Sequence, residues 1–559
     1  MRKSYLSQQI RLMSISTYDL MTDDEWAKYQ EIIDVINKLN AAKDKETKVL
    51  LAVQRKERTQ ELGELIAKHK GQPRYIRLPN VLNTARFKDG KCPLGVSWWD
   101  LRQSKQISEF VSDGSRTMGL DDRSITFDKI IVKWKSADIL EQIVLDGFYM
   151  PVMQNDSVVM KHYQITTASA GQLRTDKVQA LSDEGLQAVE CLNCGITDEI
   201  INEKGGINQN KFMAYSALPF SATDPWPEFN IDESIVIDDF EANVTGRMLY
   251  ITNEYEHIKG INTVPIKHTD GCGMKLPDAY GFTNAMVRGP YIKGLLTSFD
   301  FLKFCRVHGV APIIKDVWGQ EHNLVLENIK VIFCKSQLKL WNYYDSWEHY
   351  KTEFKRNNCH MNLTNYEETY AKDVPLNYQF LQPLIDMTDE EIDRLVKPTE
   401  SYITSIAQNK HTMLRILGAD ENSERYYQKA LGMYPELLHE AYSHESLRSI
   451  KRRMVLDARS GKLMCRNKRL YVIPDMYAAC EYWFLGIQEP QGIVKPDEVV
   501  CKAFIRSEYV DVLRSPSLYF EHNIRKVCKD PNVYEWFQTN AIVTGCRDLI
   551  SRVLQFDEH

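Results

Sequence analysis

Two neighbouring motifs decide the fold of this chain: His268-Thr-Asp-Gly-Cys-Gly-Met274 and Met286-Val-Arg-Gly-Pro-Tyr-Ile-Lys-Gly294. The Asp-Gly pair is typical of a tight turn between strands. Gly289 and Gly294 allow the backbone to approach a ligand closely, and a lysine beside such a loop is a compact positive charge suited to a phosphate. The two motifs therefore predict a phosphate-handling surface on short strands, with Arg288 and Lys293 as its cations.

The residues around these motifs have the pattern of short strands. Between 231 and 341, short β-type runs alternate with Gly, Asn and Asp, which is typical of a compact barrel. Residues 342–459 change to a helical pattern, with apolar residues at every third or fourth position. Strand-and-turn character returns at 460–559. This order predicts a barrel, a helical spacer and a second barrel.

Further cations lie near the expected strand ends. Lys335-Ser-Gln-Leu-Lys339 places two lysines where both are expected to face one side of a strand or turn. Arg514-Ser-Pro-Ser-Leu-Tyr519 contains a proline that favours an extended backbone, which holds Arg514 in place to contact hydroxyl or phosphate groups through two donors. Arg525 follows shortly after and is a second candidate for nucleotide contact.

The strongest local charge lies between Arg448 and Arg469, where nine Lys or Arg residues accompany one acid, Asp457. The whole chain has a net charge of −6, so nothing global marks a nucleic-acid binder. A local basic stretch of this kind suits a phosphodiester backbone. Its predicted nucleic-acid contacts are Lys451, Arg452, Arg453 and Lys462. The alternative is a solvated helix face.

The N-terminal region has a different pattern. Thr22-Asp-Asp-Glu25 has the spacing of a capping box, and apolar residues follow it at helical intervals. A second helical pattern runs from about Lys48 to Lys70. We therefore predict a helical hairpin over residues 1–75 and a mixed α/β region over 76–230.

Length and composition set the general class. A chain of 559 residues is expected to form about three or four domains. No apolar run approaches the roughly 20 residues of a membrane span, and the start has no secretory pattern. The twelve cysteines are irregularly spaced, as in reduced proteins. These features predict a cytoplasmic protein with no membrane partner.

Taken together, the motifs resemble the RNA polymerases built from two double-psi β-barrels. The resemblance is closest to the single-chain YonO-like polymerases of phages and prophages and to the related RNA-silencing RNA-dependent polymerases. A DG-x-G segment corresponds to Asp270–Gly273, an R-x-x-x-x-KG segment to Arg288–Gly294, an S-x-x-K segment to Ser336–Lys339, and an R-x-P element to Arg514–Pro516. The resemblance implies an α+β fold with two double-psi β-barrels, the second incomplete, joined by a helical spacer.

The resemblance also implies the chemistry. An RNA 3′-hydroxyl attacks the α-phosphate of a nucleoside triphosphate with the help of two Mg²⁺ ions. Lys293, Lys339 and Arg514 would be catalytic, and Arg288, Lys335 and Arg525 would bind the substrate. Asp557 corresponds to the first carboxylate of the metal loop. The remaining carboxylates do not follow it, so we expect the isolated chain to be inactive unless a downstream segment or a second chain supplies them.

The template is expected to be DNA and the product RNA, by analogy with the phage enzymes. An RNA template remains an alternative, since the residues do not distinguish the two. Another is a non-catalytic nucleic-acid-binding protein that kept the barrels, and a third is a scaffold with chance motif matches.

Overall fold

The computed structural model describes residues 13–77, 129–154, 157–167, 176–189, 193–216, 218, 224–406, 408–419, 425–515, 517 and 522–555. The chain divides into two compact units, each assembled from several segments. The first unit contains Met1–Asp238, Gly271–Leu296 and Ile313–Tyr366, and the second contains Asp239–Asp270, Thr297–Pro312 and Glu367–His559.

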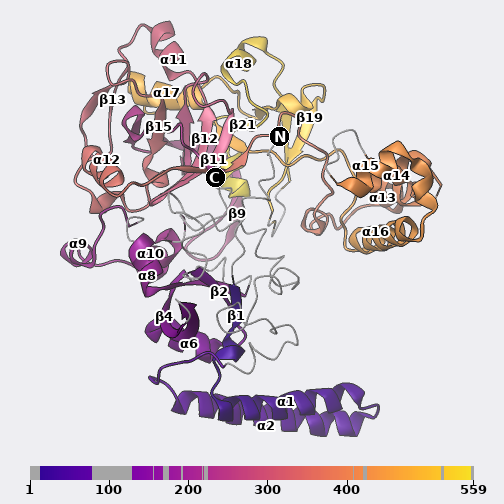
Figure 1. Cartoon of the computed structure of the whole chain (residues 1–559). Helices are drawn as coiled ribbons and strands as arrows, with labels where there is room; N and C mark the ends of the chain where they lie inside the picture. The colour runs from indigo at the N-terminus through magenta and orange to yellow at the C-terminus, as the bar shows by residue number, and fades with distance from the viewer. Residues whose placement is uncertain are drawn as a thin grey trace. The chain divides into compact units, whose positions relative to one another are not determined.

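The first unit begins with two long helices, α1 (Asp23–Ala41) and α2 (Lys45–Lys68), which pack as an antiparallel pair (Figure 1). The backbone N–H of Thr22 donates to the Glu25 carboxylate at 3.0 Å, which confirms the predicted capping box. Lys28 forms an ion pair with Glu61 at 3.1 Å, linking the two helices. The predicted helical hairpin is therefore present.

A five-stranded sheet with the strand order β1-β2-β5-β4-β3 packs against this helical hairpin. Strands β1 and β2 are parallel, whereas the other neighbours are antiparallel. Apolar residues of the sheet, among them Ile130 and Phe148, share one buried cluster with Ile32 of α1 and Ile66 of α2. The elements of this region are β1 (Met13–Ser16), β2 (Lys129–Lys133), α6 (Ala137–Asp146), β3 (Phe148–Gln154), β4 (Ser157–Thr167), β5 (Lys177–Ser182), α8 (Asp183–Val189), α9 (Asp198–Glu203) and α10 (Gln209–Ser216).

A buried ionic network fixes the start of α1. The Glu25 side chain is fully buried and accepts a hydrogen bond from Arg74 Nη1 at 2.6 Å, and it contacts His69 Nδ1 at 2.8 Å. Arg74 also donates through Nε to Gln142 Oε1 at 2.8 Å. Burial alone raises the pKa of Glu25, but the hydrogen bonds from Arg74 and His69 outweigh it and the net pKa is lowered. The start of α1, His69 at the end of α2 and Arg74 therefore meet at this carboxylate, and Arg74 links it to Gln142 of α6.

Replacing Glu25 by Ala should destabilise the first unit by about 3–5 kcal/mol, because Arg74 would remain buried without its charged partner. Urea unfolding followed by intrinsic fluorescence measures the loss. Glu61→Ala is the matched control, since its ion pair is exposed and exposed pairs contribute little. Equal losses in the two variants would contradict a central role for the buried carboxylate.

The first unit also contains a seven-stranded sheet with the order β6-β16-β11-β12-β10-β15-β7. Its strands are β6 (Asp224–Pro225), β7 (Ser234–Ile237), β10 (Cys272–Lys275), β11 (Asn284–Gly289), β12 (Ile292–Ser298), β15 (Val331–Cys334) and β16 (Asn362–Tyr366). Strands β15 and β7 are parallel, and β11 pairs antiparallel with β16. The strand order departs from the chain order, so the chain crosses over repeatedly to build this sheet. Strand β16 lies inside the range predicted to be helical.

Helix α12 (Trp347–Arg356) packs its aromatic side chains into the core of this sheet. The Trp347 and Tyr350 rings stack with centroids 4.9 Å apart, and the Trp347 indole N–H donates to the Ser234 carbonyl of β7 at 2.7 Å. A short hairpin of β13 (Ile313–Lys315) and β14 (Glu321–Asn323) belongs to the same unit.

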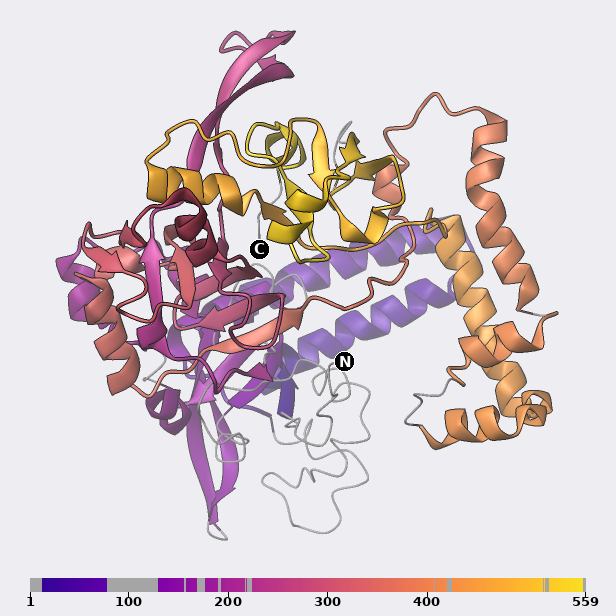
Figure 2. The same cartoon turned by 90° about the horizontal axis from the view of Figure 1, so that it is seen from above.

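The second unit contains a long two-stranded ribbon, β8 (Glu241–Ile251) and β9 (His257–Lys267), which Figure 2 shows as a narrow twisted pair. Helix α11 (Phe301–His308) follows later in the same unit. The helical part consists of α13 (Asp389–Ser405), α14 (Lys410–Ile416), α15 (Tyr426–Met433) and α16 (Ala441–Arg459). Leu417, Leu431 and Leu447 belong to its small apolar core. The helical character predicted for this stretch is confirmed at these four helices.

The C-terminal part of the second unit has a five-stranded sheet with the order β17-β21-β18-β20-β19. Asp475 is fully buried beside it and accepts hydrogen bonds from the backbone N–H groups of Tyr477, Ala478, Ile493 and Val494 at 2.8–3.2 Å. This carboxylate therefore caps α17 and also fastens the segment that leads to β18. The elements are β17 (Val472–Pro474), α17 (Met476–Leu485), β18 (Glu498–Val500), β19 (Tyr509–Val512), β20 (Asn523–Val527), α18 (Pro531–Trp536), β21 (Ile542–Thr544) and α19 (Ile550–Leu554).

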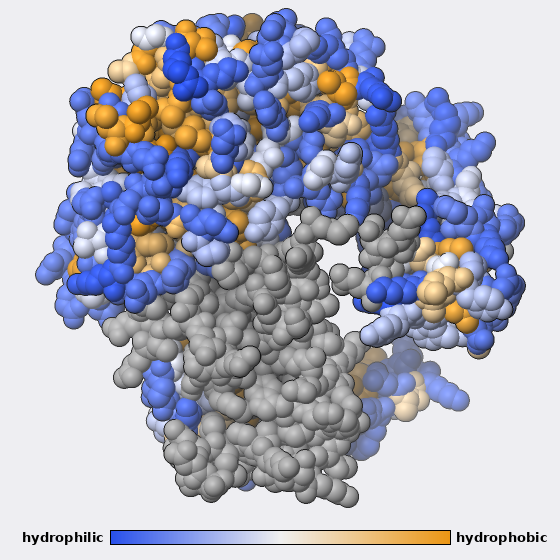
Figure 3. All heavy atoms as spheres, turned by 45° about the horizontal axis from the view of Figure 1, so that its top comes forward, coloured by the Kyte–Doolittle hydropathy of each residue, from blue (hydrophilic) through white to orange (hydrophobic). Residues whose placement is uncertain are grey.

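The structure confirms the predicted α+β class, with several sheets and a helical segment between the two β-rich stretches of sequence. In the described part of the chain, every helix is too short or too polar to cross a lipid bilayer. The face shown in Figure 3 is largely hydrophilic, with hydrophobic residues in small groups.

Candidate active site

The first unit brings three of the predicted motif segments into contact. The backbone N–H of Gly271 donates to the Ser336 hydroxyl at 2.7 Å. The carbonyl of the same glycine accepts from the Leu295 N–H at 2.8 Å. The glycine turn, the segment after Lys293 and the Ser336–Lys339 segment are therefore joined by hydrogen bonds.

Gln337 holds this arrangement from inside. Its side chain is fully buried, and its Oε1 accepts from the Cys334 N–H at 2.9 Å while its Nε2 donates to the Leu295 carbonyl at 3.0 Å. A Cβ added to Gly294 would lie 2.3 Å from Gln337 Nε2 and 2.4 Å from the Gly271 carbonyl. The glycine was predicted to allow close approach of a ligand. In the structure it is required because other parts of the chain approach it.

Replacing Gly294 by Ala should therefore destabilise the sheet by about 1–3 kcal/mol, because the new methyl group overlaps Gln337 and a backbone carbonyl. Gly63→Ala is the matched control. It lies within α2 with no atom near its added Cβ, and it should stabilise the protein by about 0.5–1 kcal/mol. Thermal melting of both variants measures the difference, and a neutral Gly294→Ala would show that Gln337 can move aside.

The two lysines predicted to be catalytic lie on adjacent segments. An isolated bridge pairs Ile292 with Leu338, the residues that directly precede Lys293 and Lys339. The Lys339 N–H also donates to the Tyr291 carbonyl at 2.8 Å, and its Nζ donates to the Ser336 carbonyl. Both lysine side chains are partly buried. The structure thus brings together the backbone segments that carry the two lysines, which are far apart in sequence.

The other predicted cations of this unit are already engaged. Lys335 Nζ lies 3.0 Å from Asp238 Oδ1 and 4.4 Å from the centroid of the Trp341 ring. Arg288 donates through Nη1 to the Val287 carbonyl at 2.7 Å. A substrate phosphate would have to compete with these contacts.

Sequence reasoning missed Lys275, which is fully buried on β10. Its Nζ donates to the carbonyls of Leu276, Pro277 and Ala279, the last at 2.8 Å. Burial lowers its pKa to about 8. A lysine in a polar turn sequence gives no signal of burial, so this role emerges only from the structure. The lysine closes the turn that follows β10.

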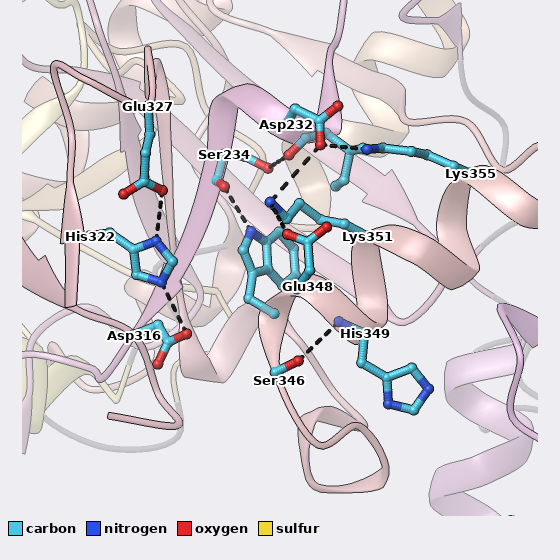
Figure 4. A network of polar contacts seen from close by, with 12 residues as sticks. Asp232, Ser234, Asp316, His322, Glu327, Ser346, Glu348, His349, Lys351 and Lys355 are labelled. Atoms are coloured by element: carbon cyan, nitrogen blue, oxygen red, sulfur yellow. Dashed lines mark hydrogen bonds and ion pairs between the residues drawn. The ribbon is translucent and has the colours of Figure 1, made fainter. Parts of the chain in front are cut away.

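A second network supports the same sheet (Figure 4). Lys355 of α12 forms an ion pair with Asp232 at 2.6 Å, just before β7. In the β13–β14 hairpin, His322 lies between two carboxylates, 3.2 Å from Asp316 and 2.7 Å from Glu327. These contacts fix the elements that surround the site. Their role is to hold elements of the first unit together.

The second unit contains the other two predicted arginines. Arg525 of β20 forms a bidentate pair with buried Asp548, at 2.6 and 2.7 Å. Arg514 is partly buried, and Pro516 of its motif lies outside the described residues. The sequence pattern gave no indication of Asp548. Its carboxylate occupies two donors of Arg525, while the predicted nucleotide contact of this arginine stays a prediction.

The basic stretch begins on α16. Arg452 and Arg453 are exposed, and Lys451 is partly buried. Lys462, just after the helix, is paired with Asp457 at 2.8 Å. The four residues predicted to contact nucleic acid therefore differ in their exposure and in whether an acidic side chain already pairs with them.

His268 opens the first motif and is buried. Its ring stacks on Phe240 with centroids 4.8 Å apart, and its Nε2 has no hydrogen-bond partner among the described residues. Burial lowers its pKa to about 4. The folded state therefore requires a neutral imidazole. His268 is thus a packed residue whose ring is neutral at neutral pH.

This burial predicts a pH dependence of stability. The folded-state pKa of about 4 lies below the ordinary value of 6.5, so the unfolded chain takes up a proton at His268 more readily than the folded protein does. The contribution of the neutral His268 ring to folding stability is therefore complete above about pH 6.5 and is lost as the pH falls toward 4. Lowering the pH from 7 to 5 should cost about 2 kcal/mol at this residue. His268→Phe should flatten the pH profile of unfolding, whereas His439→Gln, at an exposed position, should not. An unchanged profile in His268→Phe would contradict the assignment.

Predicted metal ligation lies beyond what the structure describes. Asp557 is outside the described residues. Among the residues that are described, no group of three or more His, Cys, Asp or Glu side chains is arranged to hold a metal ion.

Comparison with known proteins gives first the class and then a particular relative. No family model matches the chain. The chain is similar along its whole length to a phage RNA polymerase, which agrees with the motifs. That relative is "DNA-directed RNA polymerase YonO" of Bacillus phage SPbeta, with 37% identity over 563 residues. The match covers 100% of this chain and 63% of the relative, so this chain spans less than two thirds of that protein's length.

Proposed function

We propose that this chain is the core of a DNA-directed RNA polymerase, which extends an RNA 3′ end with nucleoside triphosphates. The observation that carries the proposal is the 37% identity to a protein of that name over the whole of this chain. The contacts among Gly271, Leu295 and Ser336 support it, because they unite the motifs on which the resemblance depends.

The proposal includes a finer description of the fold. Residues 231–341 would form a first double-psi β-barrel and 460–559 part of a second, with 342–459 as spacer. Residues 1–75 and 76–230 would be accessory. The crossed strand order of the seven-stranded sheet supports a barrel of this complexity. The pairing of β16 with β11 adds residues of the spacer range to the first barrel.

The proposed chemistry depends on the chain's own cations. During phosphoryl transfer, negative charge accumulates on the phosphate oxygens, and fixed positive groups stabilise it. Lys293 and Lys339 lie on bridged segments held by Gln337, so their backbones are fixed before the substrate binds. Arg514 would contact the incoming nucleotide.

A divalent metal, Mg²⁺ in our proposal, supplies charge neutralisation and activation of the attacking oxygen in this class of reaction. Asp557 is the proposed first ligand. The described residues do not provide a ligand set, so we assign no step through the metal. The proposed partners are a DNA template, the RNA product and nucleoside triphosphates.

Lys293→Ala tests the proposal in the protein that carries this chain. The rate of nucleotide incorporation should fall about a hundredfold, because one charged donor at the reacting phosphate is lost. Binding of the template should change little, since the contact strengthens in the transition state. Lys293→Arg should restore only part of the rate, because a planar guanidinium does not replace a compact ammonium.

Lys315→Ala is the matched control in the same unit. Lys315 is exposed and paired with Glu321 at 3.6 Å, so its loss should leave the rate unchanged. Wild-type incorporation by Lys293→Ala would remove this residue from the site. If the wild-type protein binds nucleic acid but incorporates no nucleotide, the non-catalytic alternative is favoured. If an RNA template alone is copied, the RNA-templated alternative is favoured.

A further inference from the structure

Helix α16 exposes one continuous stripe of side chains. Exposed residues recur every three or four positions, whereas Ser443 and Leu447 of the same helix are buried in the helical core. The exposed stripe consists of Tyr442, Glu445, Arg448, Ser449, Arg452, Arg453, Leu456 and Arg459. From its first to its last residue the stripe extends about 25 Å along the helix.

The charges on this stripe are unequal in availability. Arg448 is paired with Glu445 at 3.0 Å. In contrast, Arg452, Arg453 and Arg459 are exposed. Asp457, which is paired with Lys462, is near enough to Arg453 for the arginine's charge to help lower the pKa of that carboxyl. The stripe therefore presents three cations in its C-terminal half. Such a row is complementary to a series of phosphates.

Apolar groups lie on the same stripe. Tyr442 is 67% exposed and Leu456 is 57% exposed. The Tyr427 and Tyr442 rings meet edge to face, with centroids 4.9 Å apart and ring planes at 87°, so Tyr442 is held on one side while most of it stays exposed. Tyr426, which precedes Tyr427 at the start of α15, is 91% exposed. Exposed aromatic rings are not typical of a helix face that only contacts water, so these rings favour a binding surface.

We propose that the α16 stripe binds single-stranded nucleic acid, with Arg452, Arg453 and Arg459 on the phosphates and Tyr442 stacked on a base. The inference rests on the proposed function, and it names the form of nucleic acid that this face takes. A single strand exposes base faces to an aromatic ring, whereas a duplex covers them by stacking. Arginine adds cation–π contact to such bases. DNA and RNA strands share this chemistry.

Fluorescence anisotropy with the full chain tests the proposal. The probes are a 20-nucleotide oligo-dT, an oligo-rU of the same length and a blunt DNA duplex, each measured over a range of salt concentrations. Each phosphate contact contributes about 0.7 to the slope of log affinity against log salt concentration for a single strand. Replacing the three arginines by Ala should therefore make this slope shallower by about two units. Tyr442→Ala should weaken oligo-dT or oligo-rU binding about tenfold and leave duplex binding unchanged.

Matched variants separate this interpretation from a general loss of charge. Arg448→Ala and Lys462→Ala remove cations that already have acidic partners, so each should change the slope much less. Tyr442→Phe keeps the ring and should bind as the wild type does. Arg→Lys changes at the three positions should preserve the slope. All these side chains are exposed, and an unchanged melting temperature confirms that folding is retained.

An equal loss of duplex and single-strand affinity in the arginine variant, with no effect of Tyr442→Ala, would overturn the single-strand proposal. An unchanged slope would assign the arginines to a solvated face and overturn it as well. Either result leaves the polymerase proposal standing, because that proposal is tested by Lys293 and nucleotide incorporation. If the wild-type chain binds no oligonucleotide even at low salt, both proposals fail.

Discussion

The candidate site depends on the buried amide of Gln337. This one side chain accepts a hydrogen bond from the backbone N–H of Cys334 and donates one to the backbone carbonyl of Leu295, so it joins two segments of the chain. An amide is suited to the task because it donates and accepts at the same time, and a buried backbone group left without a partner is costly. Gly273 and Gly294 are glycines because any larger residue would overlap Gln337 or a neighbouring carbonyl. The positions of Lys293 and Lys339 follow from this packing.

Elsewhere, single buried ionisable groups fasten distant segments in the same way. Glu25 gathers α1, the end of α2 and Arg74, and Asp475 joins α17 to the segment before β18. Arg525 and Asp548 form a bidentate pair that joins β20 to the segment between β21 and α19. Each group is satisfied by several donors or acceptors at once, as buried charge requires. Such sites fix where segments meet more strictly than apolar contact does, because hydrogen bonds are directional.

The basic residues fall into two kinds once their partners are known. Lys335, Lys462 and Arg525 have acidic partners within hydrogen-bonding distance. Arg452 and Arg453 are exposed on α16. In sequence all five are equivalent cations in promising positions. The structure ranks them by the work that a phosphate must do to displace the existing partner.

The sequence by itself determined the local structure of this protein. The capping residues Thr22 and Glu25 located the start of α1, and the helical periodicity located α13 and α15, because these signals act between residues three or four apart. The motifs also predicted that Lys293 and Lys339 belong to one phosphate-handling site, which stays a prediction. Only the tertiary structure decided that Asp548 pairs with Arg525, that Lys275 is buried, and that β16 joins the seven-stranded sheet. These contacts join segments far apart in the chain. Their energies depend on which segments meet in the folded core, and no local pattern of residues encodes that meeting.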